Sequence, residues 1–163
     1  MKSGIVFEDK LTKGLNIYFK KVGIGKTSAG ADKKGKTAMG LQLINFIING
    51  SSAEGVTPPI LYGILRASGS VFVGSEFVGG NNLWPVTEGE ATPNTSYSSS
   101  DDNVTIGFNT AYATKLHETD WIPGQTSEQS GDTGNKFVEK HLKSDGKVLL
   151  GLYSDIIKQE SGG

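Results

Sequence analysis

The chain has no cysteine among its 163 residues. Neither a disulfide framework nor a thiolate metal site is therefore available, and the fold must rest on its core or on partner subunits. No apolar run approaches the length of a membrane span, and the N-terminus turns acidic at Glu8 and Asp9 before a signal peptide is complete. We expect a soluble protein, made in the cytoplasm and free of membrane contacts.

An excess of charge of either sign is also missing. The chain carries 16 Lys and Arg against 17 Asp and Glu, a formal net charge of −1. Nucleic-acid binding draws on a basic field that displaces counterions, so the composition does not indicate that function. The length fits one domain. We expect a single domain over residues 1–163, with mobile loops at 23–36, 81–103 and 119–134.

Apolar residues at helical spacing predict three helices. The first is amphipathic and runs from Phe7 to Val22, and the second, over residues 38–48, is apolar on nearly all sides and ends at Asn49-Gly50. The third carries an apolar stripe over residues 148–157 near the C-terminus. Five side chains are predicted to be buried, with a cost of about 2 to 5 kcal/mol for truncation to Ala: Leu43, Ile47, Leu149, Leu152 and Ile156.

Extended structure is predicted between the second and third helices. β-Forming residues occupy 71–73, 77–78 and 104–108, and intervening glycines imply bends or bulges. Before them, Thr57 fits a helix N-cap with Pro58 at the first helical position of a short helix or turn ending at Ala67. The pattern therefore predicts an α+β fold: a small antiparallel β-sheet packed by two N-terminal helices and a long C-terminal helix that crosses the sheet.

A phosphate-binding loop is the first chemical motif to consider. Gly25-Lys26-Thr27 matches the end of such a motif, but the position that requires its leading glycine is Lys20, and an amphipathic helix precedes it instead of a strand. We interpret the segment as a solvated basic loop. Its lysines, Lys26, Lys33 and Lys34, are candidates to contact a neighbouring subunit or DNA phosphates.

Titratable side chains gather in one other part of the sequence, at His117, Glu118, Asp120, Glu139 and His141. The histidines lie on separate elements and a zinc site would need a third convergent ligand, so capping and surface roles are favoured over metal binding. No activated nucleophile is recognisable. We expect no catalysis, cofactor or metal, and no effect of Lys26→Ala or His117→Ala on any small-molecule turnover.

Three short segments carry a family resemblance. They are Thr57-Pro58-Pro59 with Gly63-Ile64-Leu65-Arg66-Ala67-Ser68, then Gly107-Phe108-Asn109-Thr110-Ala111-Tyr112-Ala113 with His117-Glu118, and finally Lys136-Phe137-Val138 at the start of the last helix. Their order resembles the tail-completion (tail-to-head joining) and minor capsid proteins of long-tailed bacteriophages. The resemblance covers roughly residues 37–158, except for the loops 80–103 and 119–133.

The resemblance implies a structural protein of the phage neck in the virion. Such a protein forms a homo-oligomeric ring, a hexamer, that caps the tail and docks it to the head connector or stopper and to the tail terminator or tube, with transient contact to viral DNA in the lumen. A minor capsid or capsid-decoration protein is the alternative, and a small nucleotide-binding enzyme is a remote one. Tight nucleotide binding lost in Lys26→Ala would favour the enzyme.

Two tryptophans in polar loops are the predicted interface anchors. Trp84 precedes Pro85, and Trp121 precedes Ile122. A loop tryptophan is either an internal pin for its loop or an exposed anchor for a partner, and aromatic anchors are enriched at interfaces. We expect Trp84→Ala or Trp121→Ala to leave a folded monomer that incorporates poorly into particles.

Overall fold

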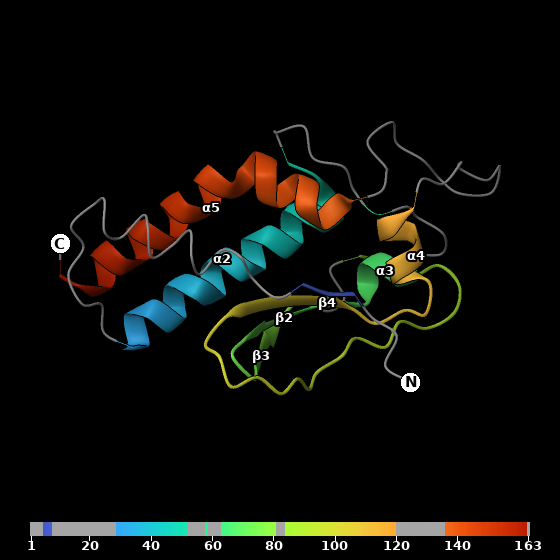
Figure 1. Cartoon of the computed structure of the whole chain (residues 1–163), viewed down its shortest axis with the longest axis horizontal. Helices are drawn as coiled ribbons and strands as arrows, with labels where there is room; N and C mark the ends of the chain where they lie inside the picture. The colour runs from blue at the N-terminus through green and yellow to red at the C-terminus, as the bar shows by residue number, and fades with distance from the viewer. Residues whose placement is uncertain are drawn as a thin grey trace.

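The computed structural model describes residues 5–7, 29–51, 58, 63–80, 84–119 and 136–162. Within these ranges the chain is an α+β domain, as predicted (Figure 1). No helix in the described ranges is both long and apolar enough to span a bilayer.

A four-stranded antiparallel sheet forms the centre of the fold. Its strands are β1 (Ile5–Phe7), β2 (Gly69–Val73), β3 (Glu76–Gly79) and β4 (Val104–Phe108). The strand order is β1-β4-β2-β3, so β2 and β4 are central and pair from Gly69↔Phe108 to Val73↔Val104. The predicted strands at 71–73, 77–78 and 104–108 are confirmed.

Glycines shape the hairpin between β2 and β3, as the sequence predicted. Gly74 turns the chain with φ 60, and its N–H donates to the carbonyl of Asn103 at 2.8 Å. The register between the two strands shifts between Val71 and Phe72. Such an irregularity locally bends and twists a strand. The hydrogen bond from Gly74 to Asn103 joins the hairpin to the residue that precedes β4.

Two long helices stack on one side of the sheet (Figure 1). The first, α2 (Ala29–Asn49), packs on β2 and β4, while α5 (Phe137–Glu160) packs mainly on α2. The C-terminal helix thus lies over α2 instead of crossing the sheet itself. Its first residue still reaches the sheet, because the Phe137 and Phe108 rings meet edge to face at 5.7 Å.

The core lies between α2, α5 and the near face of the sheet. Gly40 brings α2 close to the strands, since a Cβ there would lie 2.7 Å from Val71 Cγ1 and 2.9 Å from Val104 Cγ1. Gly35 does the same for α5, where a Cβ would lie 2.7 Å from Tyr153 Cδ2. The fully buried aliphatic side chains of this core include the following: Met39, Ile44, Ile47, Ile48, Val71, Leu149.

The far face of the sheet is covered by residues 84–103, which we call the strap. The strap has no helix or strand and runs along the side of the sheet opposite α2 and α5 (Figure 1). Its Tyr97 ring packs 5.5 Å from that of Phe72, which is 2% exposed. Residues 84–103, part of a segment predicted as a mobile loop, therefore cover part of the sheet.

Two helix predictions need correction at their N-terminal ends. Phe7, predicted to open an amphipathic helix, is the last residue of β1, and the rest of that predicted helix lies outside the described residues. Residues 29–36, predicted as part of a mobile loop, form the first turns of α2. The prediction was wrong there because lysines and glycines are typical of a solvent-exposed loop. In the structure Ala31 is buried and Lys36 forms an ion pair with Asp32.

Other boundaries are confirmed or adjusted. The helix predicted over residues 38–48 ends as expected, with Gly50 at φ 87 donating its N–H to Phe46 O at 2.8 Å. The short helix α3 (Ile64–Ala67) begins at Gly63, and Thr57 lies outside the described residues. Of the predicted core, Leu43, Ile47 and Leu149 are buried. The other two are only half-buried: Leu152 and Ile156.

Candidate functional site

The segment from Gly63 to Ser68 is a tight turn and a single helical turn. Gly63 has φ 78, and a Cβ at this position would run into the carbonyl of Pro85 and lie 2.9 Å from Trp84 Cδ1. Glycine is required here because it has no Cβ to meet the Pro85 carbonyl and because residues with side chains disfavour positive φ. At the other end Ser68 Oγ donates to Leu65 O at 2.8 Å, so the motif is closed by its own serine.

Arg66 is buried and holds three segments together. Its Nε donates to Pro58 O and its Nη1 to Ile48 O, both at 2.9 Å, and its guanidinium lies 4.3 Å from the Trp84 ring centre. Ile48 is at the end of α2, where a cation complements the helix dipole. Burial lowers the pKa of Arg66 to about 10. The arginine therefore ties the C-terminal end of α2 and the start of the strap to α3.

The second motif places the end of β4 beside α3. The Asn109 N–H reaches Ser68 O at 3.4 Å, and Asn109 Nδ2 donates to Thr92 O of the strap at 2.6 Å. The helix α4 (Ala113–Glu118) follows, with Tyr112 at its N-cap and 40% exposed. The strand predicted at 104–108 thus ends where expected, and the motif residues after it form a turn and the short helix α4.

The His117-Glu118 pair closes α4 and receives the start of α5. His117 is fully buried, its Nδ1 lies 2.7 Å from Glu118 Oε1, and its ring meets Phe137 edge to face at 4.8 Å. Glu118 also accepts from Lys136 Nζ, and the Lys136 N–H donates to His117 O at 2.9 Å. Burial lowers the pKa of His117, an effect that the hydrogen bond to Glu118 opposes.

The three motif segments therefore form one contiguous part of the fold, which we call the motif end. Ser68 and Asn109 join the first motif to the second, and Lys136 and His117 join the second to the third. Figure 1 shows α3 and α4 at the same end of the sheet. Segments up to about seventy residues apart in the sequence meet there.

The titratable residues that the sequence analysis considered together are divided between two groups in the part of the chain that the structure describes. His117 and Glu118 form one unit with Lys136, and Glu139 lies 3.8 Å from Lys136. His141 is held elsewhere on α5, and Asp120 lies outside the described residues. No set of three or more His, Asp or Glu side chains is placed to share an ion among the described residues.

His141 belongs to a buried polar group that the sequence analysis missed. Its Nδ1 lies 2.7 Å from Asp145 Oδ2, which also accepts from Ser51 Oγ at 2.9 Å and Ser144 Oγ at 3.3 Å. The i, i+4 spacing of His141 and Asp145 on a helix is a signal that could have found the pair. Ser51 comes from the end of α2, so the group fixes α5 to α2.

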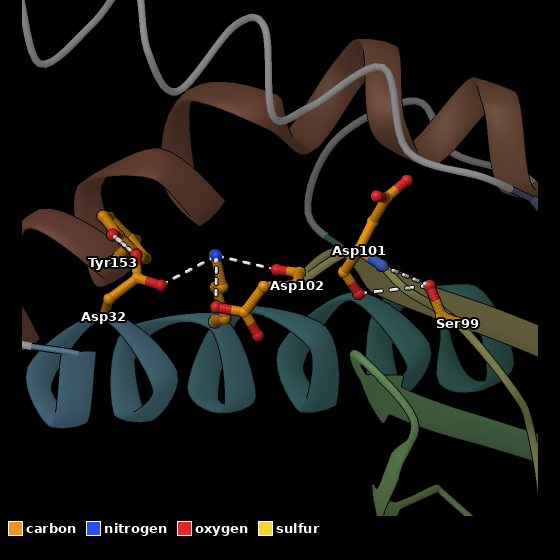
Figure 2. Close-up of polar contacts among 6 residues, drawn as sticks. Asp32, Ser99, Asp101, Asp102 and Tyr153 are labelled. Carbon is orange, nitrogen blue, oxygen red and sulfur yellow. Dashed lines mark hydrogen bonds and ion pairs between the residues drawn. The ribbon is translucent and has the colours of Figure 1, made fainter.

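A second polar group joins α2, α5 and the strap (Figure 2). Lys36 Nζ lies 2.7 Å from Asp32 Oδ2 and donates to Asp102 O at 2.7 Å. Tyr153 donates its hydroxyl to Asp32, and burial together with Asp32 raises the pKa of Tyr153. Figure 2 also shows the Ser99–Asp101 bonds that shape the end of the strap.

The predicted interface residues are spread over the surface. Trp84 is half-buried against Arg66, whereas Pro85 beside it is exposed. Lys33 and Lys34, both exposed, pair with Glu76 of β3 and Glu160 of α5. Three of the predicted residues lie outside the described ranges: Lys26, Trp121 and Ile122.

Comparison with known proteins adds no relative. No family model matches the chain, and no curated protein or solved structure matches it significantly.

Proposed function

We propose that the protein is a structural subunit of a long-tailed bacteriophage neck. As a tail-completion or head–tail joining protein it forms a ring that caps the tail and docks it to the head connector. The sequence resemblance suggests this role. It spans the three motif segments.

The convergence of the motifs at one end of the fold carries the proposal. The antiparallel pairing of Gly69 with Phe108 already places Ser68 beside Asn109, but it does not require the start of α5 to reach the same end of the fold. The three segments do meet, through Asn109 on Ser68 and Lys136 on His117. The order of the motifs thus corresponds to one structural unit, as a shared fold requires.

The roles of the motif side chains also support a structural protein. Arg66 donates to two carbonyls of other segments, and Glu118 bridges His117 and Lys136 across the junction of α4 and α5. The hydrogen bonds of these side chains join segments of the same chain. A scaffold that presents loops to neighbouring proteins needs such internal ties.

The test is to locate the protein in particles. In the phage that encodes it, a nonsense mutation in its gene should yield filled heads and complete but separate tails, and a supplied wild-type chain should restore joining. Imaging of wild-type particles should then place its density on the tail axis at the neck. Density spread over the capsid shell, or copurification with capsids that lack tails, would instead indicate a minor capsid or decoration protein.

A preparation that hydrolyses ATP and loses this activity in Lys26→Ala alone would overturn the proposal in favour of the enzyme. His117→Ala is the matched control, because His117 lies in the motif end and its loss should leave such an activity in place.

A further inference from the structure

The outer face of α5 carries cations without acidic partners. Lys143 and Lys147 are exposed, and neither forms an ion pair within the described residues. Between Glu139 and Asp155 the only carboxylate on the helix is Asp145, which is 3% exposed and turned toward Ser51. This stretch of α5 therefore presents positive charge alone to the solvent.

An apolar side chain lies beside these lysines. Val148 is 59% exposed, more than Tyr112 at 40%, which is the other exposed large hydrophobic residue in the described part of the chain. One turn after Lys147, Gly151 has no atom within 4 Å of where its Cβ would lie. Glycine inside a helix costs about 1 kcal/mol relative to alanine, and no packing within the described chain accounts for it here. The face is open to a close neighbour.

The strap carries the opposite charge. Residues 84–103 contain no Lys or Arg, and they include four carboxylates, at Glu88, Glu90, Asp101 and Asp102. All four are exposed, and among the described residues only Asp102 has a cation partner, Lys36 at 3.3 Å. The strap thus presents negative charge alone, as an extended acidic ribbon.

The two charged surfaces lie on opposite sides of the molecule. The order of layers is α5, α2, sheet and strap (Figure 1), except that the C-terminal end of the strap reaches α2 through the contact of Asp102 with Lys36. Within the described ranges no ion pair joins Lys143 or Lys147 to a carboxylate of the strap, so these opposite charges are not neutralised within one chain. They are placed to meet on different molecules.

We propose that the outer face of α5, centred on Lys143, Lys147 and Val148, docks onto the strap of a second copy of this chain, around Glu88 and Glu90. The contact joins two different surfaces, so it is heterologous, and repeated rotation closes it into a ring. This inference rests on the proposed function for the ring, and it adds which surfaces form the contact between subunits.

A second copy suits these surfaces better than nucleic acid does. Duplex DNA would use the lysines but would leave Val148 without an apolar partner and would make no use of the acidic strap. The net charge of −1 also gives the whole molecule no attraction to a polyanion. A copy of the chain supplies the matching carboxylates, and complementary charge sets the register and orientation of such a contact.

The dimensions agree with a specific contact. A helix of 24 residues is about 36 Å long at 1.5 Å per residue, and a stable interface buries about 800 Å² on each partner. A strap of 20 residues must lie along the helix, and not only cross it, to bury an area of that order. Val148 supplies a small apolar centre for this contact, and Lys143 and Lys147 with Glu88 and Glu90 supply its charged rim.

The experiment is a charge-swap by sedimentation velocity on the full chain at low salt over a wide concentration range. Lys143→Glu with Lys147→Glu makes both surfaces acidic, and Glu88→Lys with Glu90→Lys makes both basic. Each double variant alone should associate at least about tenfold more weakly than the wild type. An equimolar mixture should assemble again, because every contact then joins an acidic to a basic surface. Lys115→Glu on α4 is the matched control and should assemble normally.

Several outcomes would overturn the inference. They are a wild-type chain that stays monomeric throughout, variants that assemble as the wild type does, or a mixture that fails to recover while circular dichroism shows both variants folded. Retention of a labelled DNA duplex that is lost in the lysine variant, with self-association unchanged, would assign the face to nucleic acid instead.

The interface and the proposed function fail separately. Recovery in the mixture together with absence of the protein from the neck would retain the interface and remove the function. Failure of the mixture together with density at the neck would do the reverse.

Discussion

Arg66 stacks its guanidinium on the ring of Trp84, 4.3 Å from the ring centre, while the same guanidinium donates to Ile48 O and Pro58 O. One side chain thus joins α2, α3 and the first residue of the strap. This relationship changes what truncation of Trp84 should do, because the ring serves the monomer as well as any partner.

We predict that Trp84→Ala destabilises the isolated chain by about 1 to 3 kcal/mol, from the lost cation–π contact and the lost burial. Chemical denaturation measures this. Arg66→Ala should cost more, about 2 to 4 kcal/mol, because two buried carbonyls lose their donor. Arg66→Lys is the control, because lysine keeps the positive charge but lacks the planar guanidinium that donates to two carbonyls. Wild-type stability of Arg66→Lys would contradict this pair of hydrogen bonds.

Poor incorporation of Trp84→Ala into particles stays a prediction, and its test now requires that the variant be folded at the assay temperature. If the variant is folded at the assay temperature and still fails to join heads to tails, Trp84 anchors an interface. If joining is restored simply by lowering the temperature, the ring is an internal pin. Trp121→Ala, in a segment outside the described residues, provides the parallel case.

Truncation of two neighbouring leucines on α5 should cost different amounts of stability. Leu149 is fully buried, so Leu149→Ala should cost about 2 to 5 kcal/mol. Leu152 is half-buried and Leu152→Ala should cost clearly less, although the two residues are one turn apart on α5. Urea denaturation of both variants compares them directly. Equal losses would mean that the outer side of Leu152 is covered in solution.

A glycine pair tests the crossing of the two long helices. Gly35→Ala places a Cβ 2.7 Å from Tyr153 Cδ2 and 2.8 Å from Tyr153 Cε2, so α2 and α5 must separate and the chain should lose stability. Gly146→Ala meets no atom within 4 Å and should instead gain about 0.5 to 1 kcal/mol from helix propensity. Melting temperatures that move in the same direction for both variants would contradict the packing.

These examples show what the sequence could predict and what it could not. The periodic apolar residues of 38–48 and the alternation at 104–108 report local burial, and both elements were found correctly. The first turns of α2 were missed because the glycines and lysines of 29–36 favour a solvated loop, whereas in the structure Lys36 pairs with Asp102 and Lys33 with Glu76, both far away in sequence. Propensity alone could not show those partners.

The same limit applies to the polar groups. His141 and Asp145 are four residues apart, so a test of helical spacing would have paired them. Tyr153 and Asp32 are separated by most of the chain, and only the packing of α5 on α2 brings them together. Likewise, Val148 belonged to the predicted apolar stripe, and its exposure follows from how α5 is rotated against α2.

The buried tyrosine predicts an alkaline stability change. Burial and Asp32 raise the pKa of Tyr153 above its usual value of about 10. A folded pKa above the unfolded one contributes stability that is fully present below pH 10, and that stability is lost as the pH rises toward the folded pKa. Between pH 9.5 and about 11, the free energy of unfolding should therefore fall faster in wild type than in Tyr153→Phe. Parallel curves would show that the hydroxyl is solvated.

His117 predicts a change in the acid direction. Burial lowers the pKa of His117, and the bond to Glu118 only partly offsets this effect. The unfolded chain therefore takes up a proton near pH 6.5 before the folded one does. Stability that is complete above about pH 6.5 is lost as the pH falls toward the lower folded pKa. Replacement by a neutral side chain removes this proton uptake.

We expect the free energy of unfolding of the wild type to decrease between pH 7 and 5, and His117→Gln to show a smaller decrease over the same interval. Glu118→Gln should enlarge the decrease, because the carboxylate that favours the imidazolium is gone. Below pH 4.5 a separate loss should begin in wild type, since Lys136 and His117 lower the pKa of Glu118. If the free energy of unfolding of His117→Gln follows the wild-type curve from pH 7 to 5, His117 is hydrated. The contact of His117 and Glu118 with Lys136 then opens in solution.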